Sequence, residues 1–381
     1  MMRDDVRLHA ALIGQQGSRA RLNTPALVID LDALEHNIAA MAAFAAARGI
    51  GLRPHAKTHK SHQIARMQIE AGAIGICCAK LGEAEAITEL GGVDSILITS
   101  PVVTAQAIAR LVALHPALRE LRVVVDHALN VAALETAAAG LSRPLGVLID
   151  IDPGIRRTGV TSAAAALELA AEIQASPHLR LDGVQFYCGV QQHIAGYEER
   201  RAGIVERTRY LSDIIEQLMA AGAAPRIITG GGTGTHHIDA QLGLFTDLQV
   251  GSYVFMDRQY LDCDLTGSGI SSYRTSLFVD AHIVSANTPG MATIDAGFKA
   301  LSTDAGAPSI VSGAPENSVY HFMGDEHGAV VSRGAEFVPG ASVTLGAPHC
   351  DPTVNLYDSY HVVRGDTLID IWPVTARGRS R

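Results

Sequence analysis

Short β-branched segments alternate with longer amphipathic segments along most of the chain. Between about residue 24 and residue 254, nine runs have the composition of β-strands, and several are apolar at consecutive positions, as strands buried on both faces are. This alternation predicts βα units around a parallel sheet. The runs are ALVIDL (26–31), LRPHAK (52–57), IGICC (74–78), SILIT (95–99), LRVVVD (121–126), LGVLIDID (145–152), LDGVQFYC (181–188), RIITGG (226–231) and DLQVGSY (247–253).

The segments between these runs have the spacing of helices. Apolar residues recur three and four positions apart over 211–219, which predicts a helix with one buried face. In another expected helix, Asp32 with Glu35 three residues later resembles a capping box at the start. Nine runs exceed the eight strands of a (β/α)8 barrel, and periodicity alone does not identify the run that lies outside it.

The pattern changes after about residue 266. Four later segments alternate apolar and polar positions and are separated by glycine, proline and asparagine: TSLFVDAHIVSA, MATIDAG, ASVTLGAP and SYHVVRGDTLIDIWPV. This period of two predicts a domain of antiparallel β-strands. The basic end of the chain, ARGRSR, is expected to be frayed.

The amino-acid composition and net charge exclude or disfavour several classes of protein. The chain has 381 residues, of which 48% are hydrophobic and only 18% charged, so a disordered chain is excluded and a large core is favoured. A net charge of −9 argues against nucleic acid or an anionic membrane as partner and leaves a small molecule. The chain lacks an 18-residue apolar run and an export signal, so a cytoplasmic location is expected. The 5 cysteines form no CxxC pair and are expected to be free thiols.

A glycine-rich segment follows the eighth run. In TGGGTGT (229–235), backbone N–H groups without obstructing side chains precede an expected helix start, an arrangement that suits a phosphate group. The step Gly251-Ser252-Tyr253 ends the next run and would add donors to the same anion. The segment matches neither GxxxxGKS nor GxGxxG, so a plain glycine-rich turn stays open as the alternative.

Lys57 ends the second run, where parallel barrels place their catalytic groups. A lysine at the end of a buried strand is expected to be desolvated, with a lowered pKa, as Schiff-base chemistry requires. The alternative is a lysine whose ammonium group extends into solvent. A phosphate site and such a lysine together indicate pyridoxal phosphate.

The segment PHCDP (348–352) offers two ligand pairs for a metal ion. In an extended segment His349 and Asp351 would share one face, while Cys350 would point away. An imidazole with a carboxylate suits Mn²⁺ or Mg²⁺, and Zn²⁺ less exclusively, whereas a thiolate would favour Zn²⁺. A His–Asp pair that only holds a loop is the alternative reading.

Seven motifs, in order over about residue 22 to the end of the chain, resemble those of D-threonine aldolases. These enzymes belong with the alanine-racemase-like, fold-type III pyridoxal phosphate enzymes. The motifs are RPHAKTHK around Lys57, GICCAKLGEAEA (75–86), Arg157-Thr158-Gly159-Val160, ITGGGTGT (228–235), LQVGSYVFMD (248–257), DEHG (325–328) and HCDPTVNLYD (349–358).

The resemblance implies the layout of the chain. Residues 32–265 would form an α/β domain, a (β/α)8 barrel of the TIM type that binds pyridoxal phosphate, and residues 266–381 an antiparallel β domain that carries the metal ligands. Residues 1–31 would pack with the β domain. The run ALVIDL then belongs to the β domain, and LRPHAK begins the barrel.

The resemblance also implies the roles of individual residues. Lys57 would form the Schiff base, Arg157 would face the cofactor ring, His193 would be the base near the substrate β-hydroxyl, and His349 with Asp351 would bind the metal. The other candidates for cofactor binding are Tyr187, Thr229, Gly231, Gly232, Thr233, Gly251, Ser252 and Tyr253.

The implied activity is retro-aldol cleavage of D-β-hydroxy-α-amino acids, of the D-threonine type, to glycine and an aldehyde, by a homodimer. One departure is FYCGVQQH (186–193), which differs from the family's usual spacer and places Cys188 at a normally polar position. The alternatives are a D-threo-3-hydroxyaspartate aldolase and a metal-dependent D-hydroxyamino acid dehydratase of the same fold. The dehydratases carry a His-x-Cys metal pair where this chain has His349 and Asp351. A non-catalytic pyridoxal phosphate carrier would lack the β domain, and a racemase would need a second base.

Overall fold

Eight parallel strands form a barrel in the structure, a computed structural model that describes residues 4–381. They are β2 (Gly51–Leu52), β3 (Ile76–Cys78), β4 (Ser95–Ile98), β5 (Glu120–Val125), β6 (Leu145–Asp150), β7 (Leu179–Phe186), β8 (Ile227–Gly230) and β9 (Asp247–Leu248). Their order is β2-β9-β8-β7-β6-β5-β4-β3. Backbone hydrogen bonds from Ile74 to Leu52 and from Ala56 to Cys77 join the two ends of this order and close the sheet. The predicted barrel is therefore confirmed.

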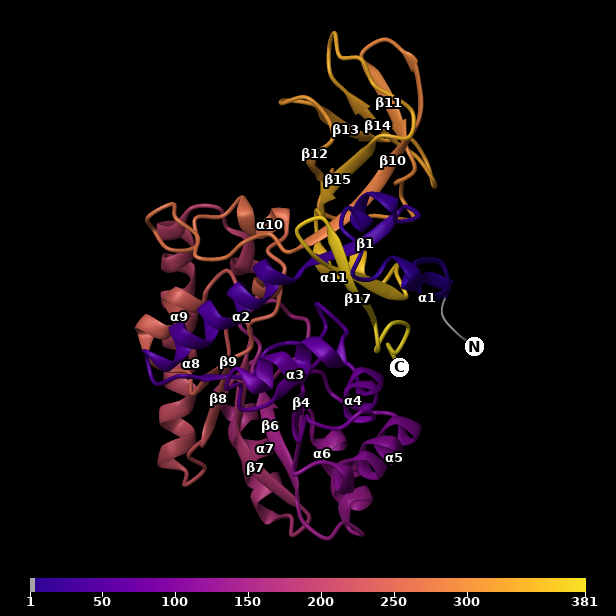
Figure 1. Cartoon of the computed structure of the whole chain (residues 1–381). Helices are drawn as coiled ribbons and strands as arrows, with labels where there is room; N and C mark the ends of the chain where they lie inside the picture. Colours follow the sequence, from indigo (N-terminus) through magenta and orange to yellow (C-terminus); the bar gives the residue numbers. More distant parts are fainter. Residues whose placement is uncertain (1–3) are drawn as a thin grey trace.

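Helices cover the outside of the barrel (Figure 1). The predicted apolar face over 211–219 lies on the longest of them, where Leu211 and Leu218 are buried, although Met219 is exposed. Side-chain caps begin several helices, for example Ser162, which accepts a hydrogen bond from the backbone N–H of Ala165. The helices are α2 (Leu31–Ala46), α3 (His62–Glu70), α4 (Leu81–Thr88), α5 (Ala105–Leu114), α6 (Ala128–Ala138), α7 (Ala163–Ala175), α8 (Tyr197–Ala220) and α9 (His236–Leu242).

The predicted capping box at the start of α2 is wrong. The cap is Asp30, whose carboxylate accepts a hydrogen bond of 3.1 Å from the backbone N–H of Ala33. Asp32 and Glu35 instead bind the guanidinium group of Arg364 on the last strands of the chain. The two acids thus tie the helix to the β domain rather than to its own first turn.

A second sheet lies beyond one end of the barrel (Figure 1). Its central path is β13-β14-β11-β10-β1-β16-β17, and β15 pairs with both β10 and β12. The predicted antiparallel domain is confirmed, since its strands pair antiparallel with one exception: β1 runs antiparallel to β10 but parallel to β16. The strands are β1 (Ala26–Asp30), β10 (Leu277–Thr288), β11 (Met291–Ile294), β12 (Ser309–Ser312), β13 (Val319–Phe322), β14 (Gly328–Val331), β15 (Ser342–Gly346), β16 (Ser359–Arg364) and β17 (Thr367–Pro373). We propose that the chain divides into an N-terminal segment (1–31), the barrel (32–265) and the β domain (266–381).

Two barrel strands, β2 and β9, are only two residues long and so fall furthest short of the predicted runs. Strand β2 ends at Leu52, because Pro54 has no backbone N–H to donate, and a single bridge between His55 and Cys77 continues the pairing. The last run is a strand only over β9 and then turns into the short helix η5 (Ser252–Val254). Both departures occur at the end of the barrel that faces the β domain.

Three smaller expectations have clear outcomes. All five cysteines are free and buried, as predicted. The end of the chain is not frayed, because Arg377 and Arg379 bind Asp358 and Glu89 at 2.7 and 2.8 Å. Within residues 4–381, no helix combines the length and the apolar character that crossing a membrane requires.

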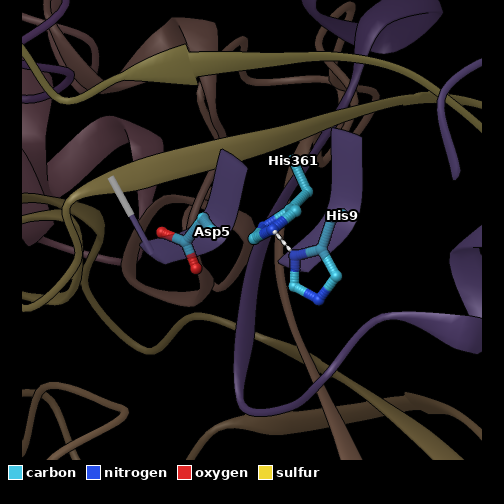
Figure 2. A group of neighbouring side chains, drawn as sticks. All are labelled: Asp5, His9 and His361. Carbon is cyan, nitrogen blue, oxygen red and sulfur yellow. Dashed lines mark hydrogen bonds between the residues drawn. The ribbon is translucent and has the colours of Figure 1, made fainter. Parts of the chain in front are cut away.

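Two buried histidines attach the first helix, α1 (Asp4–His9), to the β domain (Figure 2). The backbone N–H of Asn23 donates to His9 Nε2 at 2.9 Å, so the ring proton of His9 lies on Nδ1. That proton points at His361 Nε2, 2.8 Å away, and His361 Nδ1 in turn donates to the carbonyl oxygen of Leu27 at 3.2 Å. All four ring nitrogens are therefore satisfied with both rings neutral.

The same two rings and Asp5 bring their potential ligand atoms within 4.8 Å of one another, as in a metal site. A metal ion on His9 Nδ1 would require a proton on Nε2, which faces the N–H of Asn23. Two donors would then point at each other. The hydrogen bonding favours a structural tether here rather than a metal centre.

The tether should make the protein less stable in acid. Burial lowers the pKa of both rings, against the opposing charge of Asp5, so the unfolded chain binds these protons more tightly than the folded protein. Their stabilising contribution is complete above a pH of about 6.5 and is lost as the pH falls below it.

We expect His9→Gln to lower the free energy of unfolding by roughly 1–3 kcal/mol at pH 7, because a buried hydrogen bond is lost. Urea unfolding from pH 7 to pH 5 should show a shallower decline in the variant than in the wild type. Replacement of the exposed His321 on β13 by Gln is the control and should alter neither quantity. Equal slopes in His9→Gln and wild type would show that the pair does not titrate with folding.

Candidate active site

A cavity of about 550 Å³ opens at the carboxyl ends of the barrel strands. This is the end at which parallel barrels carry their functional groups. Side chains that follow at least six of the eight strands contribute to it, and Lys57 lies in its wall. The lining is His55, Lys57, Ala79, Lys80, Thr99, Ser100, Pro101, Val103, Asp126, Arg157, Thr158, Gln185, Tyr187 and Gln249.

Lys57 forms an ion pair with Asp351, a residue of the β domain. Lys57 Nζ donates a short hydrogen bond to Asp351 Oδ1. Burial acts to lower the pKa of Lys57, but the charge of Asp351 outweighs it and raises the pKa above the usual value. The sequence-based expectation of a lowered pKa is therefore wrong for this state of the protein. The cause is a carboxylate that is distant in sequence.

The second oxygen of Asp351 faces His349. His349 Nε2 lies 3.8 Å from Asp351 Oδ2, and His349 Nδ1 makes a 2.6 Å hydrogen bond with Asp304. A proton on Nδ1 leaves a lone pair on Nε2, and carboxylates orient metal-binding histidines in the same way. A divalent ion about 2.1 Å from each atom fits between Nε2 and Oδ2.

The predicted extended conformation of this segment is wrong. His349 is extended, but Cys350–Val354 forms the short helix α11. Pro352 favours this helix, because its fixed φ suits the first helical turn and its missing N–H is not needed there. His349 and Asp351 still converge, because one precedes the helix and the other lies in its first turn.

Cys350, the alternative ligand, is fully buried and its sulfur lies 3.6 Å from Asp351 Oδ2. The sulfur is therefore not turned as far away as an extended segment would require. Burial, together with the charges of Asp257 and Asp351, raises the pKa of this thiol well above its usual value. Without a metal ion the thiol therefore keeps its proton, whereas Asp351 beside His349 is ionised.

His193 lies in the short helix η4 (Val190–His193) that follows β7. It lies outside the lining of the cavity, and its ring centroid is 4.6 Å from that of Tyr260. Burial lowers its pKa, and the charges of His349 and Lys57 lower it further. The imidazole is therefore neutral at neutral pH, which is the form that accepts a proton.

Arg157 and Tyr187 lie together in the wall of the cavity. The guanidinium carbon of Arg157 is 5.6 Å from the centre of the Tyr187 ring. The loop that carries Arg157 is held by Asp152, whose Oδ1 accepts three backbone N–H groups between residues 154 and 156. Gly159 ends the loop at a φ of +103°, which favours glycine.

A chain of hydrogen-bonded polar side chains forms part of the cavity wall and continues into the barrel. Gln185 donates to Asp150 at 2.9 Å and accepts from Gln249, and Thr158 donates to the other oxygen of Asp150 at 2.7 Å. Burial raises the pKa of Asp150 to about 6, although these hydrogen bonds oppose the shift. Thr229, a predicted cofactor ligand, joins this layer, because its hydroxyl donates to Asp247 at 2.6 Å.

The glycine-rich segment and the 251–253 step lie side by side. The backbone N–H of Tyr253 donates to Thr233 Oγ1 at 3.0 Å. Gln192 supports the segment through a 3.0 Å bond from the N–H of Gly234 to its Oε1, and a Cβ at Gly232 would lie 2.5 Å from the same oxygen. Glycine is required at position 234, where a Cβ would lie 2.0 Å from the backbone carbonyl oxygen of Gln192.

This double segment fits the phosphate end of pyridoxal phosphate. In the described part of the chain, the backbone N–H groups of Thr233 and Ser252 have no hydrogen-bond partner. A Cβ on Gly251 would lie 3.5 Å from His55 Cβ, which places the step beside the turn that carries Lys57. Free donors, a neighbouring amine and a large cavity are the features that the cofactor requires. The Tyr253 hydroxyl instead accepts a hydrogen bond from Gln68 at 3.0 Å.

Two contributors to the site were not identified from the sequence. Asp304 orients His349, but it lies in an irregular loop with no periodic or motif signal. Gln192 supports the glycine-rich segment through a contact 42 residues away in the sequence, so no local pattern reports it.

Comparisons with known proteins agree with this arrangement. Residues 29–259 match the family of alanine racemase N-terminal domains, and residues 276–363 match the putative serine dehydratase domain. The crystal structure of D-threonine aldolase from Filomicrobium marinum superimposes with a TM-score of 0.90 at 35% sequence identity, covering 94% of this chain and 97% of that one.

Curated relatives include both aldolases and a dehydratase. The chain is 36% identical to 3-hydroxy-D-aspartate aldolase of Paracoccus denitrificans (strain Pd 1222), with 95% of this chain and 94% of the relative covered. It is 38% identical to D-threonine aldolase of Arthrobacter sp., again covering 95% and 94%. D-threo-3-hydroxyaspartate dehydratase of Delftia sp. (strain HT23) is 33% identical over 76% of each chain.

The metal pair is tested by the binding of Mn²⁺ to purified variants. Asp351→Asn should abolish tight binding, because it removes the anionic oxygen, whereas Cys350→Ser should retain it. Asp304→Asn should weaken binding by about 10–100-fold, as loss of a group that orients a ligand does. Electron paramagnetic resonance of free Mn²⁺ gives the dissociation constants. Loss of the ion in Cys350→Ser with normal binding in Asp351→Asn would assign the site to the thiol.

Proposed function

Because this chain belongs to the D-threonine aldolase family of alanine-racemase-like enzymes, we propose that it cleaves D-β-hydroxy-α-amino acids into glycine and an aldehyde. The proposed enzyme is a lyase that uses pyridoxal phosphate and a divalent metal ion, Mn²⁺ or Mg²⁺ before Zn²⁺. The observation that carries the proposal is the position of Asp351 between Lys57 Nζ and His349 Nε2. One carboxylate thus brings the cofactor lysine and the metal pair to the same point.

Lys57 is the residue that would bind the cofactor covalently, and the N–H groups of Thr233 and Ser252 would hold its phosphate. When bound, pyridoxal phosphate supplies an acceptor for the electron pair that remains on Cα when the Cα–Cβ bond breaks. Arg157 and Tyr187 lie in the same cavity wall and would orient the ring. The cavity, at about 550 Å³, is in the range of cofactor sites.

His349 and Asp351 are the residues that would hold the metal ion, whose charge would lower the pKa of the substrate β-hydroxyl. Because the protein would supply only these two ligands, water and a substrate oxygen could complete the coordination of Mn²⁺ or Mg²⁺. Cys350 and Asp257 lie behind this pair, and the backbone N–H of Cys350 donates to Asp257 at 2.8 Å. That bond fixes the start of α11 and with it the direction of Asp351.

His193 would remove the proton of the β-hydroxyl at a ring nitrogen. The oxygen then forms the aldehyde double bond, the Cα–Cβ bond breaks, and Cα receives a proton to give glycine. His193 suits this step because burial lowers its pKa and keeps it neutral. The charge of His349 also acts on His193 and lowers its pKa further, so the base lies within electrostatic range of the residues that would hold the metal.

Dehydration by the same fold is the second candidate, since one relative is a dehydratase. That reaction makes the β-oxygen a leaving group and yields a 2-oxo acid and ammonia. An imidazole and an ionised carboxylate, without a thiolate, would suit a hard metal ion, which would supply acidification of the β-hydroxyl and so favour aldol cleavage. The proposal also includes a cytoplasmic homodimer.

The covalent attachment site is tested by borohydride reduction of the purified holoenzyme. Reduction should fix the cofactor to one peptide, the one that contains Lys57, and Lys57→Ala should abolish this labelling. Lys80→Ala is the matched control, because Lys80 is exposed and also lines the cavity. Labelling of Lys60 or Lys80 in the wild type would refute the assignment.

The reaction is tested by product analysis with D-threonine, D-phenylserine, D-threo-3-hydroxyaspartate and their L-isomers. We expect glycine and aldehyde from D-substrates, no reaction of L-substrates, and a rate loss of roughly 10²–10⁴-fold in His193→Ala, the usual contribution of a general base. His321→Ala, at an exposed strand position, should keep the full rate. Ammonia and a 2-oxo acid as main products, without aldehyde from D-threonine, would establish the dehydratase instead.

A further inference from the structure

A second cavity, of about 380 Å³, lies at the opposite end of the barrel. Strands β5, β8 and β9 begin there, so it is separated from the candidate active site by the length of the strands. Nothing in the proposed reaction uses this end of the barrel. The lining is Arg53, Ile74, Arg119, Glu120, Arg122, Arg226, Ile227, Thr246 and Asp247.

Arginines outnumber carboxylates around this cavity. Asp182, just behind the lining, accepts from Arg122 at 2.8 Å and from Arg180 at 2.7 Å, and it also binds Arg226. Three further ion pairs around the cavity do not involve Asp182. They are Arg122 with Glu120 at 2.9 Å, Arg119 with Glu120 at 3.3 Å and Arg53 with Asp247 at 3.6 Å.

The network keeps an excess of two positive charges. Five guanidinium groups face three carboxylates, and a guanidinium group does not lose its proton in proteins. Hydrogen bonding by Arg122 lowers the pKa of Glu120 to about 2. Burial raises the pKa of Asp182, but bonds from Arg180 and Arg122 outweigh it and bring it to about 2. Both acids are therefore ionised at neutral pH and already fully engaged.

Several arginine donors have no acceptor. Arg53 is only 3% exposed, yet its Nε has no hydrogen-bond partner, because Asp247 Oδ1 is 3.6 Å away. This Nε has no contact with solvent, so the positive charge of Arg53 acts on the cavity from behind its wall, and only the arginine donors at the mouth are open to a ligand. Arg119 and Arg226 are each 65% exposed at the mouth and retain free N–H groups.

We propose that this cavity binds a doubly charged phosphate group, either as free phosphate or as a small phosphate ester. Arginine is suited to phosphate because its planar donors match the oxygens of the anion. The charge of the ligand equals the excess charge of the network. Ile74 is 47% exposed at the rim and gives the organic part of an ester an apolar contact. The proposal does not depend on the proposed aldolase reaction.

The test is isothermal titration calorimetry of the holoenzyme with sodium phosphate and with phenyl phosphate, each at constant ionic strength set by chloride. We expect saturable binding of one equivalent. The double variant Arg119→Gln/Arg226→Gln should weaken it at least tenfold, which corresponds to about 1.4 kcal/mol. Both side chains are exposed, so the variant should fold, and a thermal melt checks this. Arg66→Gln, an exposed arginine on α3, is the matched control and should bind as the wild type does.

The two probes separate the two sources of the phosphate group. Tighter binding of phenyl phosphate, reduced in Ile74→Ser, identifies a phosphate ester, whereas equal affinities identify free phosphate. The absorbance of the cofactor should not change during either titration. The proposal is overturned by an absence of saturable heat, by equal affinity in the double variant and wild type, or by release of the cofactor in proportion to the heat.

Discussion

The carboxylate of Asp351 is the group on which the candidate site depends. One oxygen binds Lys57 of the barrel, and the other faces His349 of the β domain. Burial alone would favour neutral forms of Lys57 and Asp351, yet each charge stabilises the other, so the pKa of the lysine is raised and that of the acid is lowered. Removing Lys57 would leave the carboxylate of Asp351, whose side chain is only 16% exposed, without its opposite charge. In this state of the protein, the ion pair therefore joins the barrel to the β domain at the candidate site.

The chain connections place the two halves so that this contact forms. Strand β1 lies in the β domain, and its last residue, Asp30, caps the helix α2 that runs along the barrel. Asn37 on that helix donates to the carbonyl oxygens of Val254 and Arg274, and accepts from the N–H of Arg274 at 2.8 Å. One buried amide thus fixes the segment after the 251–253 step to the segment that leads into β10. The phosphate end of the site and the β domain are positioned by the same side chain.

Sequence patterns predicted the elements but not the contacts between them. The barrel strands were located because buried parallel strands are apolar at consecutive positions, and the β domain because its strands alternate. The pKa of Lys57 was mispredicted, since its partner lies 294 residues away and no local pattern reports it. Asp304 was missed for the same reason. His349 and Asp351 do lie close together, but not in the predicted extended conformation, because Pro352 favours the first turn of a helix.

The two ends of the barrel differ in the protonation states of their buried groups, because only the groups at the amino end are all paired with opposite charges. At the carboxyl end, burial lowers the pKa of His55 to about 3, lowers that of His193 and raises that of Asp150 to about 6. Burial there favours the neutral forms of groups that exchange protons, as acid–base chemistry requires. At the amino end, Arg122 and Asp182 are also buried, but each charge has an opposite charge within 3 Å and stays ionised. Proton transfer therefore suits only the carboxyl end. The fixed charges of the amino end suit recognition of an anion without chemistry.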